Sequence, residues 1–252
     1  MDTFGTNAKF EAPAFSKSKA VYSSELAIPI ETQTDHNTIK QVFITKLIFL
    51  LPTIIQAIPL MLVEDSRMYL KDNSSMVYFA LVLYASATLI FTFLPNMQNR
   101  NPYTIVSAFV MIESLTAIIA FISSYYQGIV VLTSFGAAVI ACVSLAALGI
   151  YCTQLNLDKI NVAVFGIGVL IFIVGIIIYA VELFVTCYTV NAIYSILALL
   201  VMYIYFFHAV QGLNDKTKPL EECDKFIVAM SLYTNFITIF LLCENLFTAI
   251  KI

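Results

Sequence analysis

Residues 226–250 read FIVAMSLYTNFITIFLLCENLFTAI, an apolar run in which Glu244 is the only charged side chain. A transmembrane helix needs about 20 mostly apolar residues, because the hydrocarbon layer is roughly 30 Å thick and each helical residue rises about 1.5 Å. The run is therefore long enough for one crossing. Its apolar residues are continuous rather than alternating, which favours a helix over a strand of a membrane barrel.

Six further stretches of the same character lie upstream. They cover residues 42–63, 76–95, 102–124, 128–150, 160–185 and 190–207. We predict an all-α membrane protein, a seven-transmembrane-helix bundle that forms one domain over residues 42–252. Residues 1–41 are rich in polar side chains and hold no apolar run long enough for the core of a signal peptide. We predict that this segment is a disordered tail.

The composition supports a membrane location. Apolar residues make up 60% of the chain and charged residues 12%, whereas soluble domains have about 45–50% and about 25%. Five cysteines in 252 residues do not fit a small disulfide scaffold. The net charge of −3 and the lack of a basic block disfavour a nucleic-acid partner. The expected partner is the lipid bilayer.

The distribution of lysine and arginine predicts the orientation, because both residues accumulate in cytoplasmic segments. A cytoplasmic N-terminus puts ten of the 13 on the inner side: Lys9, Lys17, Lys19, Lys40, Lys46, Arg100, Lys159, Lys216, Lys218 and Lys225. The outer side then has only Arg67, Lys71 and Lys251. Lys46 lies inside the first predicted span, and we expect its long side chain to snorkel back to the inner interface.

Several kinds of enzyme chemistry lack their residues. A catalytic zinc site needs three protein ligands, typically including histidines, and the two histidines are His36 in the tail and His208 at the end of the sixth span. Intramembrane aspartyl proteolysis needs paired carboxylates, but no aspartate lies in a predicted span. A nucleophile elbow, a P-loop and a Cys-x-x-Cys pair are also missing from the sequence. We therefore expect no enzymatic activity, no cofactor and no fixed metal.

An ionisable side chain inside lipid costs several kcal/mol, so such a group is a functional candidate that faces the bundle interior. Glu113, at the centre of the third predicted span, is the strongest candidate. We predict that it is a proton-sensitive cation ligand; the alternative is a neutral glutamate that is hydrogen-bonded to another helix. Glu182 and Glu244 lie near the outer ends of their spans and are weaker candidates, because a side chain there can snorkel outward.

The last predicted span also carries a polar stripe. At about 100° per residue, its members fall on one face about 80° wide. They are Ser231, Asn235, Thr238 and Asn245. A narrow stripe of this kind suits a helix that lines a path, and hydrogen bonding between helices is the alternative. Glu244 points to the opposite side of the same helix.

The residues described so far carry a resemblance to a known family. The stretches are NPY at 101–103, IESLT at 112–116, IYCTQ at 150–154 and AMSLYTNFITIFL at 229–241. Their order and spacing resemble the Bax-inhibitor-motif family, and in particular its Lifeguard and Golgi anti-apoptotic branch. The resemblance covers about residues 38–250 and leaves the tail out.

The resemblance implies a seven-helix fold in which the last helix is surrounded by the other six. It also implies residence in endoplasmic reticulum or Golgi membranes, a pH-sensitive calcium leak with calcium as the permeant ion, and inhibition of apoptosis. The implied partners are membrane-embedded cell-death or calcium-handling proteins. Glu113 matches a glutamate position of the family.

One departure from the family concerns its gate, which consists of two aspartates that share a proton. The corresponding positions hold His208 and Asn235. A histidine gains positive charge on acidification and repels calcium, so we expect the pH-gated leak to be altered or lost. The alternative is a non-conducting interaction protein that regulates cell death through partners in the membrane.

Overall fold

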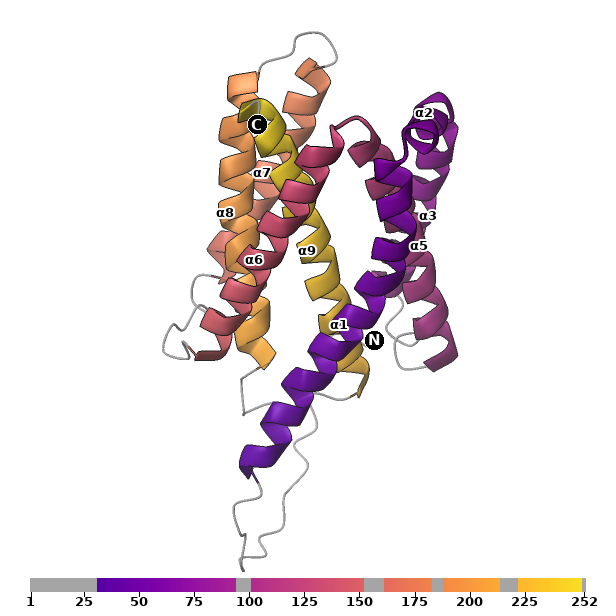
Figure 1. The fold of residues 1–252 in the computed structure, drawn as a ribbon. Coiled ribbons are helices and arrows are strands. Elements are labelled where there is room, and N and C mark those ends of the chain that lie inside the picture. Colours follow the sequence, from indigo (N-terminus) through magenta and orange to yellow (C-terminus); the bar gives the residue numbers. More distant parts are fainter. Residues whose placement is uncertain (1–30, 94–100, 152–160, 183–187, 214–221, 251–252) are drawn as a thin grey trace, which may run out of the picture.

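The computed structural model describes residues 31–93, 101–151, 161–182, 188–213 and 222–250, and within these ranges the chain is helical with short turns and no strand. In chain order the helices are α1 (Glu31–Leu62), α2 (Glu64–Asp72), α3 (Ser75–Phe93), α5 (Asn101–Ser124), α6 (Gly128–Tyr151), α7 (Asn161–Glu182), α8 (Tyr188–Leu213) and α9 (Glu222–Ile250). Most of them run side by side along one direction (Figure 1).

Five of these helices are long and apolar enough to cross a membrane: α1, α5, α6, α8 and α9. A sixth crossing results if α2 and α3 are counted as one span that is bent by 77°. Each predicted span overlaps a helix, and residues 94–95, 160 and 183–185 of two of the spans lie outside the described ranges. The all-helical class with five candidate membrane-spanning helices is thus confirmed for the described ranges, and the number of seven crossings stays a prediction.

Helices α1 and α8 extend well beyond the predicted spans because their ends pack against neighbours. α1 begins at Glu31, inside the segment assigned to the tail, and residues 1–30 lie outside the described ranges. Ile39 at this end belongs to the hydrophobic core, and Gln41 accepts a hydrogen bond of 3.0 Å from Lys225 of α9. α8 continues to Leu213, which is also buried.

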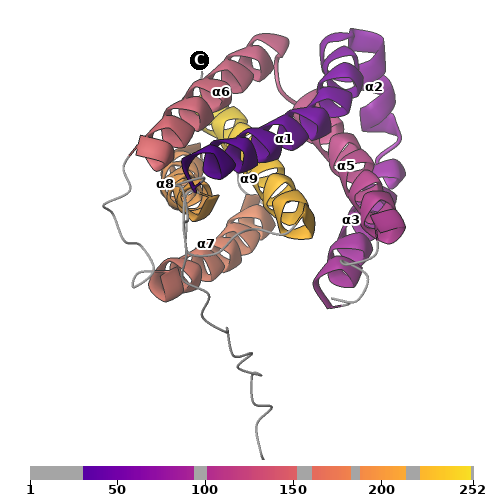
Figure 2. The ribbon, with the colours of Figure 1, turned by 90° about the horizontal axis from the view of Figure 1, so that it is seen from below.

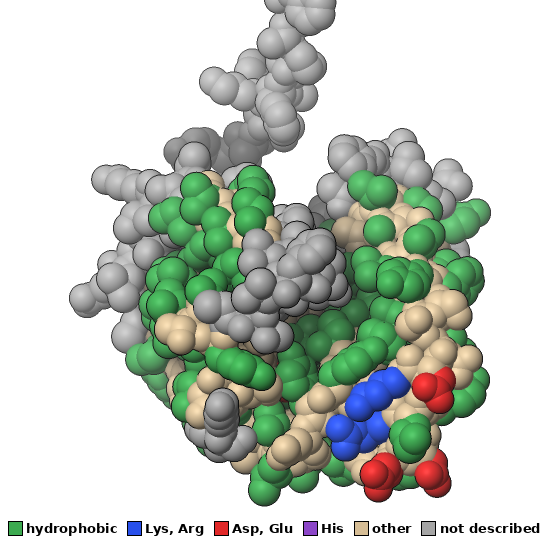
Figure 3. Space-filling model, turned by 90° about the horizontal axis from the view of Figure 1, so that it is seen from above, with side chains coloured by type: hydrophobic (Ala, Val, Ile, Leu, Met, Phe, Trp, Pro, Cys, Tyr) green, Lys and Arg blue, Asp and Glu red, His purple; other side chains and the backbone are tan. Residues whose placement is uncertain are grey.

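The connection expected after the first span is itself a helix, α2, which has no buried residue. It carries acidic residues in its first turn and Lys71 in its last turn, and this suits a short helix on the membrane surface. Seen from the α2 end, charged side chains gather in one region of an otherwise mostly apolar face (Figure 3). Arg67 of α2 donates hydrogen bonds to the carbonyls of Ser124 and Tyr126. It therefore caps the end of α5, whose last carbonyls lack helical partners.

α9 lies between four of the other described helices. It contacts α1, α5, α6 and α8, and it lies in the middle of the arrangement when the helices are seen from below (Figure 2). Half of its membrane-crossing window is buried, against 28–44% for the other four candidate spans. The side chains of α1 that face away from α9 are exposed and apolar; they include Leu47, Ile48, Leu51 and Ile55.

Glycines allow two helix pairs to approach closely. A Cβ atom added at Gly149 of α6 would lie 2.8 Å from Cγ1 of Val210 in α8, and one added at Gly168 of α7 would lie 2.8 Å from the hydroxyl of Tyr205 in α8. Gly166, by contrast, has nothing within 4 Å. Gly149 and Gly168 therefore permit close helix contacts, whereas Gly166 does not take part in one.

Candidate functional site

The polar side chains of α5 form bridges to α1 and α9. Glu113, Thr116 and Ser123 fall within about 80° of one another around the helix, and each is hydrogen-bonded to another helix. Glu113 and Ser123 are ten residues apart, which is about 15 Å along the axis or half of the hydrocarbon layer. We refer to these three residues and their partners as the polar ladder. Its members are Thr53, Gln56, Glu113, Thr116, Ser123, Tyr233 and Glu244.

Each contact between helices in the polar ladder is called a rung, and the rung at the middle of α5 joins Glu113 to α1. The side-chain amide of Gln56 donates a hydrogen bond of 3.1 Å to Oε1 of Glu113. Glu113 is half-buried and Gln56 is exposed. The structure thus places Glu113 at the edge of the bundle, next to a neutral donor and not next to a described cation.

The next rung is a chain of three buried hydroxyls. Thr116 donates to the carbonyl of Ile112 at 2.7 Å, so its oxygen is left to accept from Thr53 at 3.0 Å. The hydroxyl of Tyr233, 2.7 Å from Thr53, then donates to Thr53. In this assignment Tyr233 is the first donor, and Thr53 and Thr116 each accept one hydrogen bond and donate another, which strengthens the chain. Tyr233 is completely buried.

The third rung contains the most deeply buried carboxyl among the described residues. The Ser123 hydroxyl donates a hydrogen bond of 2.9 Å to Oε2 of Glu244. Glu244 is 0% exposed, and its Oε1 has no hydrogen-bond partner among the residues that the structure describes. The expectation that Glu244 snorkels outward is wrong, because the C-terminal part of α9 is covered by α5 and other helices.

Two further hydroxyl oxygens resemble Oε1 of Glu244, because they too are buried polar atoms without a hydrogen bond in the described ranges. The side chains of Ser134 in α6 and Ser195 in α8 are buried and lack a hydrogen-bond partner among the described residues. Ser134 lies about two turns after the start of α6, and Ser195 lies about two turns after the start of α8. Both helices start on the side of the bundle where α9 ends (Figure 1). A buried polar atom without a partner costs about 1–3 kcal/mol, so this half of the bundle contains several costly polar groups.

Lys46 also differs from its prediction. The expected snorkelling would leave it exposed, yet it is only 7% exposed. Its ammonium nitrogen lies 4.7 Å from the ring centre of Phe206 in α8 and 5.4 Å from that of Phe236 in α9. The side chain therefore points into the bundle, where aromatic rings contact its charge.

The two positions suggested for the gate lie on the expected helices, His208 on α8 and Asn235 on α9. Both side chains are half-buried. No hydrogen bond between them is found in the part of the chain that the structure describes. The structure therefore brings together Glu113, Tyr233 and Glu244 with their partners, but it does not show a linked pair at the gate positions.

The polar stripe of α9 is on the less buried side of that helix. Ser231 is exposed, and Thr238 and Asn245 are half-buried. Thr238 lines a pocket of about 330 Å³ between α7, α8 and α9. The stripe and Glu244 point to opposite sides, as the helical geometry predicted, but the deeply buried polar group is on the Glu244 side. Glu182 is the last residue of α7, and its side chain lies outside the described set.

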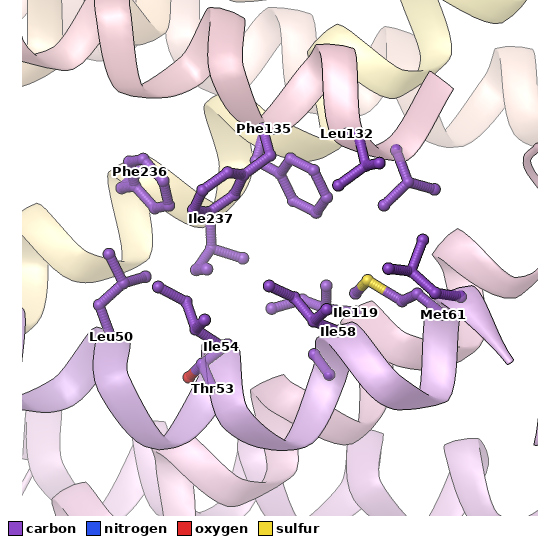
Figure 4. Close-up of a pocket in the computed structure, with 14 residues that line it drawn as sticks. Leu50, Thr53, Ile54, Ile58, Met61, Ile119, Leu132, Phe135, Phe236 and Ile237 are labelled. Atoms are coloured by element: carbon purple, nitrogen blue, oxygen red, sulfur yellow. The ribbon is translucent and has the colours of Figure 1, made fainter. Parts of the chain in front are cut away.

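A second pocket lies beside the polar ladder, between α1, α5, α6 and α9. Its volume is about 40 Å³, and apolar side chains such as Ile58, Ile119, Phe135 and Phe236 surround it (Figure 4). Thr53 is its only polar lining residue, and the hydroxyl of Thr53 is taken up by the polar ladder. Apolar cavities of this size stay dry, so the pocket offers no water-filled passage.

The described ranges contain no group of three or more His, Cys, Asp or Glu side chains that could hold a metal ion. Cys142 and Cys243 are buried free thiols. Calcium as a permeant ion, without a fixed site, stays a prediction.

The sequence pointed to Glu113 but missed most other members of the polar ladder. Thr116 and Ser123 share its face of α5, and Thr53 and Gln56 are polar residues in the first span. This signal is readable at about 100° per residue. Which helix each polar face meets depends on tertiary packing, and a single sequence does not give that.

Comparisons with known proteins add no family assignment. A search against models of protein families finds no match, and neither does a comparison with curated proteins. The resemblance to the Bax-inhibitor-motif family therefore remains an expectation based on the stretches quoted above.

Proposed function

We propose that this chain is a multi-pass protein of an internal membrane, endoplasmic reticulum or Golgi, that conducts a slow cation leak and thereby modulates calcium and apoptosis. The proposal includes membership of the Bax-inhibitor-motif family, a cytoplasmic N-terminus and an altered gate at His208 and Asn235. The observation that carries it is the polar ladder, because it positions two carboxyl groups, Glu113 and Glu244, along half the thickness of the hydrocarbon layer.

The physical support is the free-energy cost of placing the two carboxyl groups inside a membrane. Ionisable residues within membrane helices are expensive, and they commonly mark ion or proton pathways. The hydroxyl chain of Tyr233, Thr53 and Thr116 bridges α9, α1 and α5. Carboxylate and carbonyl oxygens are the ligands that calcium prefers in proteins. A cation that moves along α5 would meet a carboxyl group at Glu113 and another at Glu244, with the hydroxyl chain between them.

The test is calcium flux into liposomes that contain the purified protein. We expect Glu113→Gln and Glu244→Gln each to reduce the flux, because each removes a carboxylate from the polar ladder. Glu64→Gln is the matched control, since it removes an exposed carboxylate of α2 outside the polar ladder. Equal flux in all three variants and the natural protein would contradict the proposed path.

The gate has a separate test. If the loss of two aspartates altered the pH response, the double variant His208→Asp, Asn235→Asp should acquire a leak that acid inhibits. Flux measured between pH 5 and pH 8 compares this variant with the natural protein. An acid-inhibited leak already present in the natural protein, and unchanged in the double variant, would contradict the altered gate.

A second candidate function is a non-conducting interaction protein that regulates cell death through partners in the membrane. It is favoured by the way the polar ladder is satisfied internally, since the hydroxyls bind one another, and by the apolar lining of the neighbouring pocket. This function predicts that Glu113→Gln leaves ion flux unchanged while the protein still alters cell survival.

A further inference from the structure

The environment of Lys46 is an aromatic one built from three helices. Its ammonium nitrogen lies 6.0 Å from the ring centre of Phe43 in α1, 4.7 Å from Phe206 in α8 and 5.4 Å from Phe236 in α9. Phe206 is 0% exposed and Phe236 is 3% exposed. We refer to Phe43, Phe206 and Phe236 as the phenylalanine cage.

The phenylalanine cage holds a positive charge without a described counter-charge. No carboxylate forms an ion pair with Lys46 in the part of the chain that the structure describes. The faces of aromatic rings carry partial negative charge, and a cation within about 6 Å of a ring centre is attracted to it. Sites built from several such rings recognise ammonium groups in other proteins. The rings are therefore the part of the structure that stabilises this buried charge.

The phenylalanine cage adjoins the polar ladder on two helices. On α9, Phe236 is three residues after Tyr233, so the two are neighbours on the helix surface. On α1, Lys46 is seven residues before Thr53, and the two lie about 20° apart around the helix. The charge of Lys46 is thus placed at one end of the row of polar groups that the proposed cation path uses.

We infer that the phenylalanine cage is a binding site for alkylammonium ions and that the ammonium of Lys46 is its built-in occupant, which limits cation movement through the bundle. The part concerning cation movement rests on the proposed function, and the part concerning binding does not. A tethered cation at the end of the path repels any free cation that enters it. Shortening Lys46 removes this charge and leaves the three rings unoccupied.

The binding part is tested on the variant Lys46→Ala, purified as the full chain in detergent. The substitution removes a group equivalent to n-propylammonium, which is therefore the probe. We expect n-propylammonium to raise the unfolding temperature of this variant, and to bind on the order of tenfold more tightly than neutral 1-propanol, because only the ion gains from the ring faces. The natural protein should show no such response, because its phenylalanine cage is filled.

Lys40→Ala is the matched control. Lys40 lies on the same helix and is exposed, so this variant loses the same charge without opening the phenylalanine cage. A response to n-propylammonium in Lys40→Ala equal to that in Lys46→Ala would overturn the inference. Equal binding of n-propylammonium and 1-propanol by Lys46→Ala would also overturn it, because the site would then be only an apolar space.

The flux part uses the liposome assay. We expect Lys46→Ala to pass calcium several-fold faster than the natural protein, and added n-propylammonium to return the flux toward the natural level. If Lys46→Ala does not fold, Lys46→Met replaces it; this variant keeps an apolar stem, lacks the charge, and should also conduct faster. Unchanged flux in the folded variant, with a measurable leak in the natural protein, would overturn the blocking role. No flux in any variant would contradict the proposed function, and the binding measurement would still decide the phenylalanine cage.

Discussion

Replacing Glu244 with leucine should stabilise the protein while it reduces cation flux. The carboxyl is 0% exposed, and no group in the described part of the chain forms a hydrogen bond with its Oε1. A buried polar atom left in this state costs about 1–3 kcal/mol, and replacing buried ionic groups by apolar ones of similar size is often neutral or stabilising. Leucine fills a similar space without a polar atom, so the cost disappears.

The opposing effect is the loss of the hydrogen bond from Ser123. Side-chain hydrogen bonds between membrane helices contribute about 0.6 kcal/mol on average. Ser123 can instead donate to a carbonyl of its own helix, as Thr116 does to Ile112 at 2.7 Å. The net expectation is a stabilisation of about 0.5–2 kcal/mol, because the relieved cost of about 1–3 kcal/mol is larger than the lost bond. For a chain of this size that corresponds to about 2–4 °C in Tm per kcal/mol.

The matched change is Ser123→Ala, which removes the one hydrogen-bond donor that Glu244 has within the described ranges. It should destabilise the protein by about 1–3 kcal/mol, and Glu244→Leu should suppress this effect in the double variant. Thermal unfolding in one detergent measures all four proteins of the cycle. A clear fall in Tm for Glu244→Leu, or no change in Tm for Ser123→Ala, would refute the reasoning.

Three further changes test the packing. Tyr233→Phe removes the first donor of the hydroxyl chain and should lower the free energy of unfolding by about 0.6–1.5 kcal/mol; an unchanged Tm would show that the hydroxyl is not bonded as described. Gly149→Ala places a methyl group against Val210 and should lower the free energy of unfolding by about 1–3 kcal/mol. In the control Gly136→Ala, on the same helix, the added methyl group meets nothing within 4 Å, so this variant should be neutral or stabilising. The opposite order of Tm values would contradict the α6–α8 packing. Arg67→Ala uncaps the end of α5 and should cost about 1.5–3 kcal/mol, measured by thermal unfolding; Tm equal to that of the natural protein would mean that water replaces the guanidinium at no cost.

The membrane class and the helices were predictable because they depend on the length and continuity of apolar runs, which a single sequence contains. The end of α8 was harder, because Val210 and Leu213 continue the helix only where other helices bury them. The helix α2 was missed because six of its nine residues are polar, and the three apolar residues, Met68, Tyr69 and Leu70, form too short a run to mark a helix.

The environment of the charged residues was predictable only in part. Glu113 was identified from its central position, but Lys46 and Glu244 were both expected to reach the membrane surface, and both are buried. The direction of a long side chain depends on which neighbours leave room for it. At Lys46 the rings of Phe206 and Phe236, which are far away in the sequence, provide that room.

The position of α9 has a consequence for biogenesis. The ribosome completes α9 only after all the helices that it contacts, α1, α5, α6 and α8, have been made. Until then, the serine, threonine and lysine side chains that meet α9 have no protein surface to cover them, and lipid or insertion machinery must shield them. Assembly of this domain is therefore expected to be a late event, triggered by insertion of one segment and not built up helix by helix during translation.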